Sequence, residues 1–158
     1  MRGDGNLNSV GQLVSILHRQ YQIFVNNALE DLNIGSSEYQ FLVLACREEG
    51  LIQEQISERL VIDKAATARA LCSLEGKGYI YRVEAECDHR KKKVYPTEAG
   101  KACLPIIRSR LNNWTNMVME ELDSDDIKTV TDSLEIMTTR AFALNHIISC
   151  DEEKGKKP

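Results

Sequence analysis

Two groups of cationic side chains near the middle of the chain have the chemistry to bind the phosphates and bases of duplex DNA. The first group, Lys64 and Arg69, follows Asp63, a residue type that favours the N-cap of a helix. The second group is the basic run Asp88-His89-Arg90-Lys91-Lys92-Lys93. A helical arginine can donate two hydrogen bonds to a guanine, and a narrow minor groove attracts an inserted arginine.

The distribution of charge supports this interpretation, although the total charge does not. The 158-residue chain has a formal net charge of −4. Between residues 64 and 93, however, eight basic residues stand against four acidic residues, a local net charge of +4. One face should therefore attract phosphate while the rest of the protein repels it, which favours a single docking orientation.

The spacing of apolar residues predicts the elements that carry the two cationic groups. A short helix over about 53–60 leads through a turn to a helix over about 63–76. A strand over 79–83, a polar hairpin over 84–92 and a return strand at 94–95 follow. The side chains expected on the inner face of the second helix are Ala68, Leu71, Cys72 and Leu74. This order predicts a winged helix-turn-helix in a fold that is mainly α with a small β-hairpin wing.

Long amphipathic helices are predicted on both sides of this region. Apolar residues recur every three or four positions over 10–32 and over 98–121, and over 127–148 the steps form a heptad pattern. Ser36 or Ser37 is expected to cap the helix that follows, because Ser37 and Gln40 have capping-box spacing. Thr97 is expected to cap the helix that starts at residue 98.

These flanking helices have more apolar surface than the small winged region can cover. We therefore expect residues 10–34 and 98–149 to form a helical dimerisation region and residues 35–97 to form the DNA-binding region; an intramolecular bundle is the alternative. Residues 1–9 are predicted to be a flexible tail and residues 150–158 a charged tail. A symmetric dimer would match a palindromic DNA site.

Composition argues against several other classes of protein. No apolar run approaches the roughly 18 residues of a membrane span, and the first residues lack a signal-peptide core, so a cytoplasmic protein without membrane contact is expected. The cysteines Cys46, Cys72, Cys87, Cys103 and Cys150 form no C-x-x-C pair, which indicates small buried residues with free thiols. Neither His146 with Cys150 nor Cys87 with His89 completes a metal site. No catalytic constellation or cofactor motif is present, so no enzyme, metal or cofactor is expected.

The predicted DNA contacts lie on the second helix of the helix-turn-helix and on the wing. Arg90 is the strongest candidate, since Asp88 could hold its guanidinium in a fixed orientation. Arg82, at the end of a strand, could pair with Asp88 or with an acid of a terminal helix, or contact a phosphate. The residues predicted to contact DNA are Lys64, Ala65, Ala66, Thr67, Arg69, Asp88, His89, Arg90, Lys91 and Lys92.

A second predicted site is an aromatic pocket for a small-molecule effector. The side chains that could line it are His18, Tyr21, Tyr39, Phe41 and Trp114, although each could instead belong to the core. For oxidant sensing, a thiol must be exposed and have a lowered pKa. Cys87, next to the basic run, is the cysteine best placed for that role.

As a set, these motifs resemble the MarR family of bacterial and archaeal transcription regulators. The resemblance rests on the helix that starts at Asp63, the strand that ends at Arg82 and the Asp88-His89-Arg90 wing. It also rests on two flanking motifs, Leu74-Glu75-Gly76-Lys77-Gly78 and Thr97-Glu98-Ala99-Gly100. His89 stands where the family often has another arginine, and Pro96 where an apolar residue is common.

The resemblance extends over roughly residues 10–148 and implies a winged helix-turn-helix homodimer that represses nearby genes. Family ligands are often phenolic or otherwise aromatic anions bound between the two regions, while some members sense oxidants and a few sense zinc. We therefore expect a sequence-specific regulator that binds a palindromic operator as a homodimer and is released by a small aromatic or phenolic ligand. The alternatives are an oxidant-sensing regulator that uses a cysteine thiol, and a winged-helix protein-interaction module without DNA binding.

Overall fold

The computed structural model describes the backbone of residues 7–86 and 88–154, with side chains over 10–86 and 88–144. Contacts divide the chain into two compact units, Met1–Trp114 and Thr115–Pro158. The side chains of the two predicted tails, 1–9 and 150–158, lie outside the described residues. None of the described helices is apolar enough over a sufficient length to span a membrane.

The first unit begins with helix α1, Leu7–Ala28, a 3₁₀ turn η1, Glu30–Leu32, and helix α2, Tyr39–Arg47. The helix predicted over 10–32 therefore ends earlier, and the left-handed backbone of Asn33, with φ of 53°, ends the 3₁₀ turn that follows. The capping-box prediction for Ser37 is wrong. The N-cap residue of α2 is Glu38, whose carboxylate accepts a hydrogen bond from the Gly35 N–H at 2.8 Å, in the loop before the helix.

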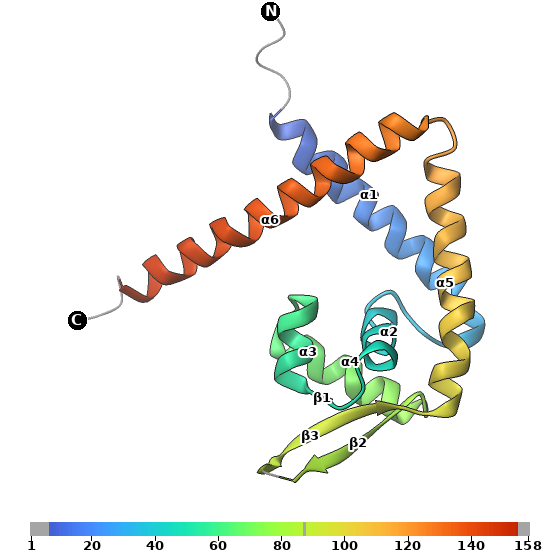
Figure 1. Ribbon diagram of the computed structural model, residues 1–158, viewed down its shortest axis with the longest axis vertical. Helices are drawn as coiled ribbons and strands as arrows, with labels where there is room; N and C mark the ends of the chain where they lie inside the picture. Colours follow the sequence, from blue (N-terminus) through green and yellow to red (C-terminus); the bar gives the residue numbers. More distant parts are fainter. Residues whose placement is uncertain (1–6, 87, 155–158) are drawn as a thin grey trace, which may run out of the picture. The chain divides into compact units, whose positions relative to one another are not determined.

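Helices α3, Gln53–Leu60, and α4, Lys64–Gly76, form the predicted helix-turn-helix (Figure 1). Strands β2, Ile80–Ala85, and β3, Asp88–Pro96, form the antiparallel hairpin that we call the wing. Both strands extend further into the polar segment than predicted, because cross-strand pairing continues past Glu84 opposite Lys92 and, after a register shift, to Ala85 opposite Asp88. A two-residue strand, β1 at Leu51–Ile52, pairs with β3 and gives the sheet order β1-β3-β2. It is too short to produce a periodic pattern and was not predicted.

One hydrophobic core holds the elements of the first unit together. It combines α1, α2, α3, α4, the sheet and the first half of α5. Its most buried side chains include Leu29, Phe41, Leu42, Ile56, Leu71, Leu74, Ile80, Val94 and Ile107. Full burial of one such side chain contributes roughly 1.5–3 kcal/mol, so this core fixes α4 and the base of the wing against α2.

Helix α5, Glu98–Val118, starts at the base of the wing. Thr97 caps it as predicted, because its Oγ1 accepts a hydrogen bond from the Gly100 N–H at 3.1 Å. The same hydroxyl lies 2.7 Å from the carbonyl oxygen of Gly78. Gly100 is buried, and a Cβ at this position would lie 2.2 Å from the carbonyl oxygen of Tyr79. Only glycine permits this approach of α5 to the wing.

In the second unit, helix α6, Ser124–Lys154, follows Asp123, whose carboxylate accepts hydrogen bonds from the Asp125 and Asp126 N–H groups at 2.9 Å each. The helix contains the predicted heptad pattern over 127–148. Its apolar side chains at Val130, Leu134, Met137 and Leu144 are between 39% and 60% exposed. An amphipathic helix with this exposure requires a further apolar partner.

Candidate nucleic-acid interface

Helix α4 begins where the sequence predicts. Asp63 is its N-cap, and the Oδ1 atom accepts a hydrogen bond from the Ala66 N–H at 2.8 Å. Three predicted DNA-contact residues of the helix, Lys64, Ala65 and Arg69, are exposed, and Ala66 is half-buried. The first turns of α4 therefore present most of the predicted side chains to solvent.

Thr67, which was predicted to contact DNA, is not exposed. Its side chain is completely buried, because Oγ1 donates to the carbonyl oxygen of Asp63 at 2.9 Å and accepts from the Ser57 hydroxyl at 2.9 Å. A buried hydroxyl needs such partners, since an unsatisfied one costs about 1–3 kcal/mol. Thr67 therefore joins α4 to α3, and its side chain is not exposed for contact with DNA.

The orientation of α4 also differs from the prediction. Its buried residues are Thr67, Ala70, Leu71 and Leu74. Cys72, which was predicted to be buried, is exposed, and Ala68 is only half-buried. The exposed residues Ala65, Arg69, Cys72 and Gly76 recur at steps of three and four, and we call them the outward stripe. The prediction missed Cys72, although its position three residues after Arg69 already placed the two on one face.

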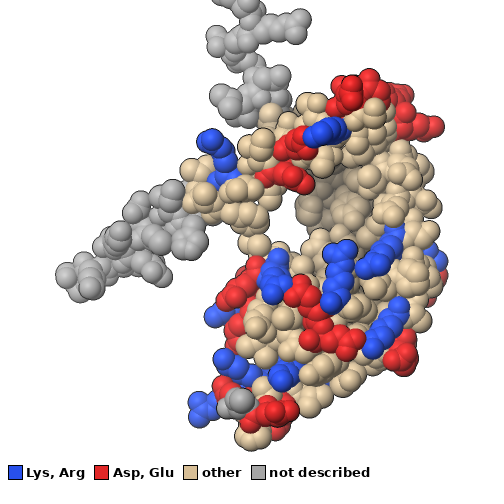
Figure 2. Space-filling view, viewed as in Figure 1, with Lys and Arg blue, Asp and Glu red and all other residues tan. Residues whose placement is uncertain are grey.

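The wing carries the densest group of predicted contacts. Asp88, His89, Arg90, Lys91 and Lys92 are all exposed, and Figure 2 shows Lys and Arg side chains projecting at the hairpin end with acids beside them. The His89 Nδ1 atom lies 3.3 Å from a Glu84 carboxylate oxygen. Within the part of the chain that the structure describes, the remaining cations Arg90, Lys91 and Lys92 form no ion pair. Their charge is therefore available to phosphate.

Asp88 and Arg82, at the wing, have different partners from those considered in the sequence. Asp88 Oδ1 accepts a hydrogen bond from the backbone N–H of Arg90 at 3.1 Å, so it shapes the turn rather than holding the guanidinium. Arg82 pairs with Glu75 of α4, with its Nε 3.0 Å from the carboxylate, and not with Asp88 or a terminal-helix acid. The hydrogen bond with Arg82 holds the pKa of Glu75 below its usual range and raises the pKa of Arg82. This ion pair joins the wing to α4.

A basic cleft of about 260 Å³ lies between the start of α3 and the wing. Gln53 and Glu54 line one side, and the wing lines the other with Arg82, Arg90, Lys91, Lys92 and Val94. Arg90 at this place has the charge to attract a phosphate group of a DNA backbone. The cleft therefore combines predicted DNA-contact residues of the wing, such as Arg90, with two residues of α3, Gln53 and Glu54, that were not predicted as contacts.

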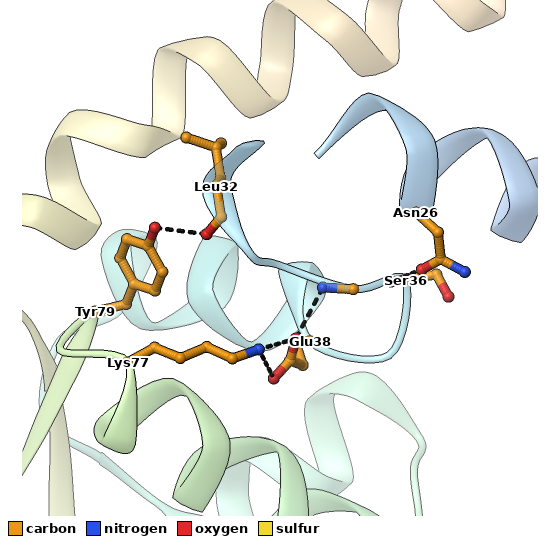
Figure 3. Close-up of polar contacts among 7 residues, drawn as sticks. Asn26, Leu32, Ser36, Glu38, Lys77 and Tyr79 are labelled. Atoms are coloured by element: carbon orange, nitrogen blue, oxygen red, sulfur yellow. Dashed lines mark hydrogen bonds and ion pairs between the residues drawn. The ribbon is translucent and has the colours of Figure 1, made fainter. Parts of the chain in front are cut away.

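The other end of α4 is fixed to the loop before α2 (Figure 3). Lys77 donates from Nζ to both Glu38 carboxylate oxygens, at 2.7 and 2.8 Å. Burial opposes ionisation of Glu38, but hydrogen bonds from Lys77, Ser73 and the Gly35 backbone outweigh it and lower the pKa. Beside this pair, the Tyr79 hydroxyl donates to the carbonyl oxygen of Leu32 at 2.6 Å. These contacts position α4 and are not predicted by any local pattern in the sequence.

The five residues of the predicted aromatic pocket separate into two groups. His18 and Phe41 line a cavity of about 570 Å³ between α1, α2 and α4, which Gln22, Arg69 and Ser73 also line. Tyr21 instead packs on Trp114, with ring centroids 4.7 Å apart, and its hydroxyl lies 3.0 Å from that of Tyr39. Burial, and then the Tyr39 hydrogen bond, raise the pKa of Tyr21. Tyr21, Tyr39 and Trp114 therefore form an aromatic cluster and do not line this cavity.

The cysteines have different environments. Cys103 is buried as predicted and Cys46 is half-buried, where desolvation raises the pKa of its thiol. Cys72 is exposed, 3.4 Å from the Arg82 guanidinium. Cys87, the cysteine best placed for oxidant sensing, and the side chains of His146 and Cys150 lie outside the described residues. Among the residues that are described, no group of three or more His, Cys, Asp or Glu side chains could hold a metal ion.

Comparisons with known proteins match this chain to transcriptional regulators. A model of the MarR family matches residues 32–91, from η1 to the wing. A MarR transcriptional regulator from Methanosarcina mazei Go1 is 35% identical, with a TM-score of 0.80, over 85% of this chain and 97% of that protein. The HTH-type transcriptional regulator YybA of Bacillus subtilis (strain 168) is 27% identical over 125 residues, 79% of this chain and 83% of that protein.

A structure solved with nucleic acid has the same fold. It is a putative MarR family transcriptional regulator from Listeria monocytogenes complexed with 26mer DNA. It is 24% identical to this chain, with a TM-score of 0.78 and coverage of 99% of both chains. At that identity the likeness concerns the fold alone.

Proposed function

This chain belongs to the MarR family of DNA-binding transcriptional regulators and is not an enzyme, and on that premise we propose that it is a homodimeric repressor. In this proposal the dimer acts in the cytoplasm on a palindromic operator. Each α4 enters the major groove, and each wing lies against the adjacent minor groove. A small aromatic ligand releases the protein from DNA.

One observation supports the mode of DNA binding above all others. The outward stripe of α4 and the cations at the end of the wing are exposed in the same unit, on elements that Arg82 and Glu75 join. Arg69 on the stripe suits a base contact, and Arg90 at the wing suits the minor groove. Lys91 and Lys92 then supply phosphate contacts, with Lys64 at the start of α4.

Exposed apolar surface on the flanking helices supports a dimer. On α1 the side chains of Val10, Leu13, Val14, Ile16 and Leu17 are 40–63% exposed. On α6, Val130, Leu134, Met137 and Leu144 are also exposed, as are Met117 and Val118 at the end of α5. Monomeric soluble proteins rarely leave so many large apolar side chains in water. A second copy would cover them, and a two-fold dimer matches a palindromic site.

The cavity next to α4 is the proposed effector site. His18 and Gln22 reach it from α1, and Arg69 reaches it from α4. An occupant would therefore touch both a scaffold helix and the helix that is proposed to enter DNA. A ligand that binds more tightly to the conformation in which the two α4 helices are wrongly spaced shifts the population toward that form. An anionic aromatic compound could also pair with the Arg69 guanidinium.

Selection of duplexes from a random-sequence pool tests the proposed operator. We expect enrichment of an inverted repeat whose half-site centres lie about one helical turn apart, with a symmetric footprint. Affinity should fall steeply with salt, because phosphate binding releases counterions. An asymmetric footprint shorter than a turn would contradict the dimer on a palindrome. The absence of any enrichment or salt dependence would instead favour a protein-interaction module.

A thermal-shift screen of aromatic acids tests the proposed effector. A compound that binds the folded protein should raise its melting temperature and weaken DNA binding. Replacing the cavity residues by His18→Ala and Gln22→Ala should abolish both effects. Arg19→Ala is the matched control, since Arg19 lies on the same helix but does not line the cavity. A ligand that still acts on the double variant would place the effector elsewhere.

A further inference from the structure

We propose that α4 reads each half-site through one guanine, bound by Arg69, flanked by thymine methyl groups that pack against Ala65 and Cys72. The inference rests on the proposed function, because it requires α4 in the major groove. It concerns the class of DNA sequence that this chain selects. It is based on which polar side chains of α4 have hydrogen-bond or ion-pair partners within the protein.

Most polar side chains of α4 are already engaged within the protein. Thr67 is hydrogen-bonded to Ser57 and to the carbonyl oxygen of Asp63. Ser73 donates to the buried Glu38 carboxylate, and Glu75 is paired with Arg82. None of these groups can form a hydrogen bond with a base without first leaving its partner, which would leave a polar group unsatisfied. They are therefore unavailable for base reading.

Two cationic side chains of α4 remain. Among the residues that the structure describes, Lys64 and Arg69 have no side-chain hydrogen-bond or ion-pair partner, and both are exposed. The planar guanidinium of Arg69 matches the O6 and N7 acceptors of guanine, whereas the ammonium of Lys64 is a point charge. Lys64 also lies at the helix N-terminus, where phosphate is favoured. The structure thus assigns base reading to Arg69 and phosphate binding to Lys64.

The rest of the outward stripe is small and weakly polar. Ala65 offers a methyl group, and Gly76 has no side chain. Cys72 offers a thiol whose sulfur already accepts a hydrogen bond from Arg82 at 3.4 Å. Such surfaces can contact the C5-methyl group of thymine but provide no hydrogen-bond code. They also allow the helix backbone to approach the floor of the groove closely.

Helix geometry sets the distance between these contacts. Ala65 lies four residues before Arg69 and Cys72 three residues after it, which corresponds to about 6 Å and about 4.5 Å along the axis. Base pairs are stacked about 3.4 Å apart. The thymines read by Ala65 and Cys72 should therefore fall within about two base pairs of the guanine, one on each side.

The test begins with the duplex that the wild-type homodimer enriches from the random pool. Each base pair of one half-site is replaced in turn, and each thymine is separately replaced by deoxyuridine, which lacks only the 5-methyl group. We expect one G·C pair per half-site whose replacement lowers affinity about 5- to 150-fold. Deoxyuridine should lower affinity about two- to four-fold at thymines within two base pairs of it.

Variants then connect each position to a side chain. Arg69→Ala should abolish discrimination at that G·C pair, and Arg69→Lys should restore charge but little discrimination. Ala65→Gly should remove the deoxyuridine effect at one thymine, and Cys72→Ser should reduce it at another. A loosened helix would weaken binding to thymine and deoxyuridine duplexes equally, so only a lost difference between them counts as support.

The outcomes separate this inference from the proposed function. If Arg69→Ala weakens all duplexes equally and keeps the base preference, Arg69 is a phosphate contact and the inference is wrong. It is also wrong if deoxyuridine has no effect near the selected guanine, or if a second G·C pair remains discriminated in every variant. If the wild-type protein enriches no duplex at all, the proposed function fails first.

Discussion

Helix α4 and the wing expose different kinds of side chain to solvent. The outward stripe of α4 consists of small residues and one arginine, while the inner face of the same helix is fully buried. The end of the wing, from Asp88 to Lys92, is a row of exposed polar and charged side chains with no buried residue. A surface of the first kind can select bases at close range, whereas one of the second kind provides attraction with little sequence information.

Their attachments differ as well. Helix α4 is held at its start by Asp63 and Thr67, and just beyond its end by Lys77, which pairs with Glu38. Within the described residues, the wing is attached at its base, where Arg82 pairs with Glu75, where β1 pairs with β3 and where Gly100 packs against Tyr79. A helix held at both ends and a hairpin whose end carries exposed cations suit the separate tasks of reading bases and of binding the backbone.

The largest expected effect concerns the base of the wing. Gly100→Ala places a Cβ 2.2 Å from the Tyr79 carbonyl oxygen, so the backbone must move, and we expect a loss of roughly 3 kcal/mol in unfolding free energy. Gly76→Ala on α4 is the matched control, because apart from its chain neighbours and the adjacent backbone of its own helix no atom of the protein lies within 4 Å of its Cβ position. It should be neutral or stabilise by up to about 1 kcal/mol. Urea unfolding measures the free energy of unfolding of both variants. Equal losses would show that the close contact of Gly100 with Tyr79 does not hold the base of the wing.

Arg90→Ala tests the tip of the wing. We expect a loss of roughly 1–3 kcal/mol in binding free energy, spread over most DNA sequences, because the arginine is proposed to enter the minor groove rather than read a base pattern. Unfolding free energy should not change, since the side chain is exposed. Fluorescence anisotropy with enriched and scrambled duplexes measures the effect. A loss confined to one base position would assign base reading to the wing as well.

Thr67→Val tests the attachment of α4 to α3. The change keeps the shape but removes the hydroxyl that bonds to Ser57 and Asp63, leaving a buried Ser57 hydroxyl without its acceptor. We expect a loss of about 1–2 kcal/mol in unfolding free energy. The double variant Ser57→Ala/Thr67→Val should recover part of it. If Thr67→Val instead weakens DNA binding without affecting stability, the residue faces DNA after all.

Glu38 should make the attachment beyond the end of α4 sensitive to acid. Its pKa in the folded protein lies below the ordinary value of 4.5, so its stabilising effect is complete above that pH and is lost as pH falls through the folded pKa. Glu38→Gln should therefore destabilise the protein at neutral pH, and its difference from wild type should shrink in acid. Urea unfolding over a pH series measures this. Glu58→Gln is the control, since it removes a carboxylate that is exposed on α3.

The smallest effects belong to single lysines of the wing. Lys91→Gln and Lys92→Gln should each lower the slope of log affinity against log salt by about one unit and leave base preference unchanged. Lys128→Gln is the control, because Lys128 lies in the second unit and pairs with Asp132. An equal change of slope in all three variants would show that the wing lysines contribute only through net charge.

Local signals in the sequence were sufficient for much of the fold. Asp63 and Thr97 mark the starts of α4 and α5, since an N-cap depends on residues three positions away. The periodicity of 127–148 predicts α6, and the charge run predicts the wing. The orientation of α4 was predicted less well. Cys72 was assigned to the core by residue type, whereas the buried hydrogen bond between Thr67 and Ser57 turns that side of the helix inward.

The sequence by itself therefore determined the order of the elements and the location of the positive charge, because both follow from residue types and from spacings of a few positions. The tertiary structure decided which side of α4 faces outward and what holds the helix in place. Lys77 meets Glu38 across 39 residues and Tyr79 meets Leu32 across 47. Contacts at such separations form only when the core brings the segments together, so no local pattern predicts them.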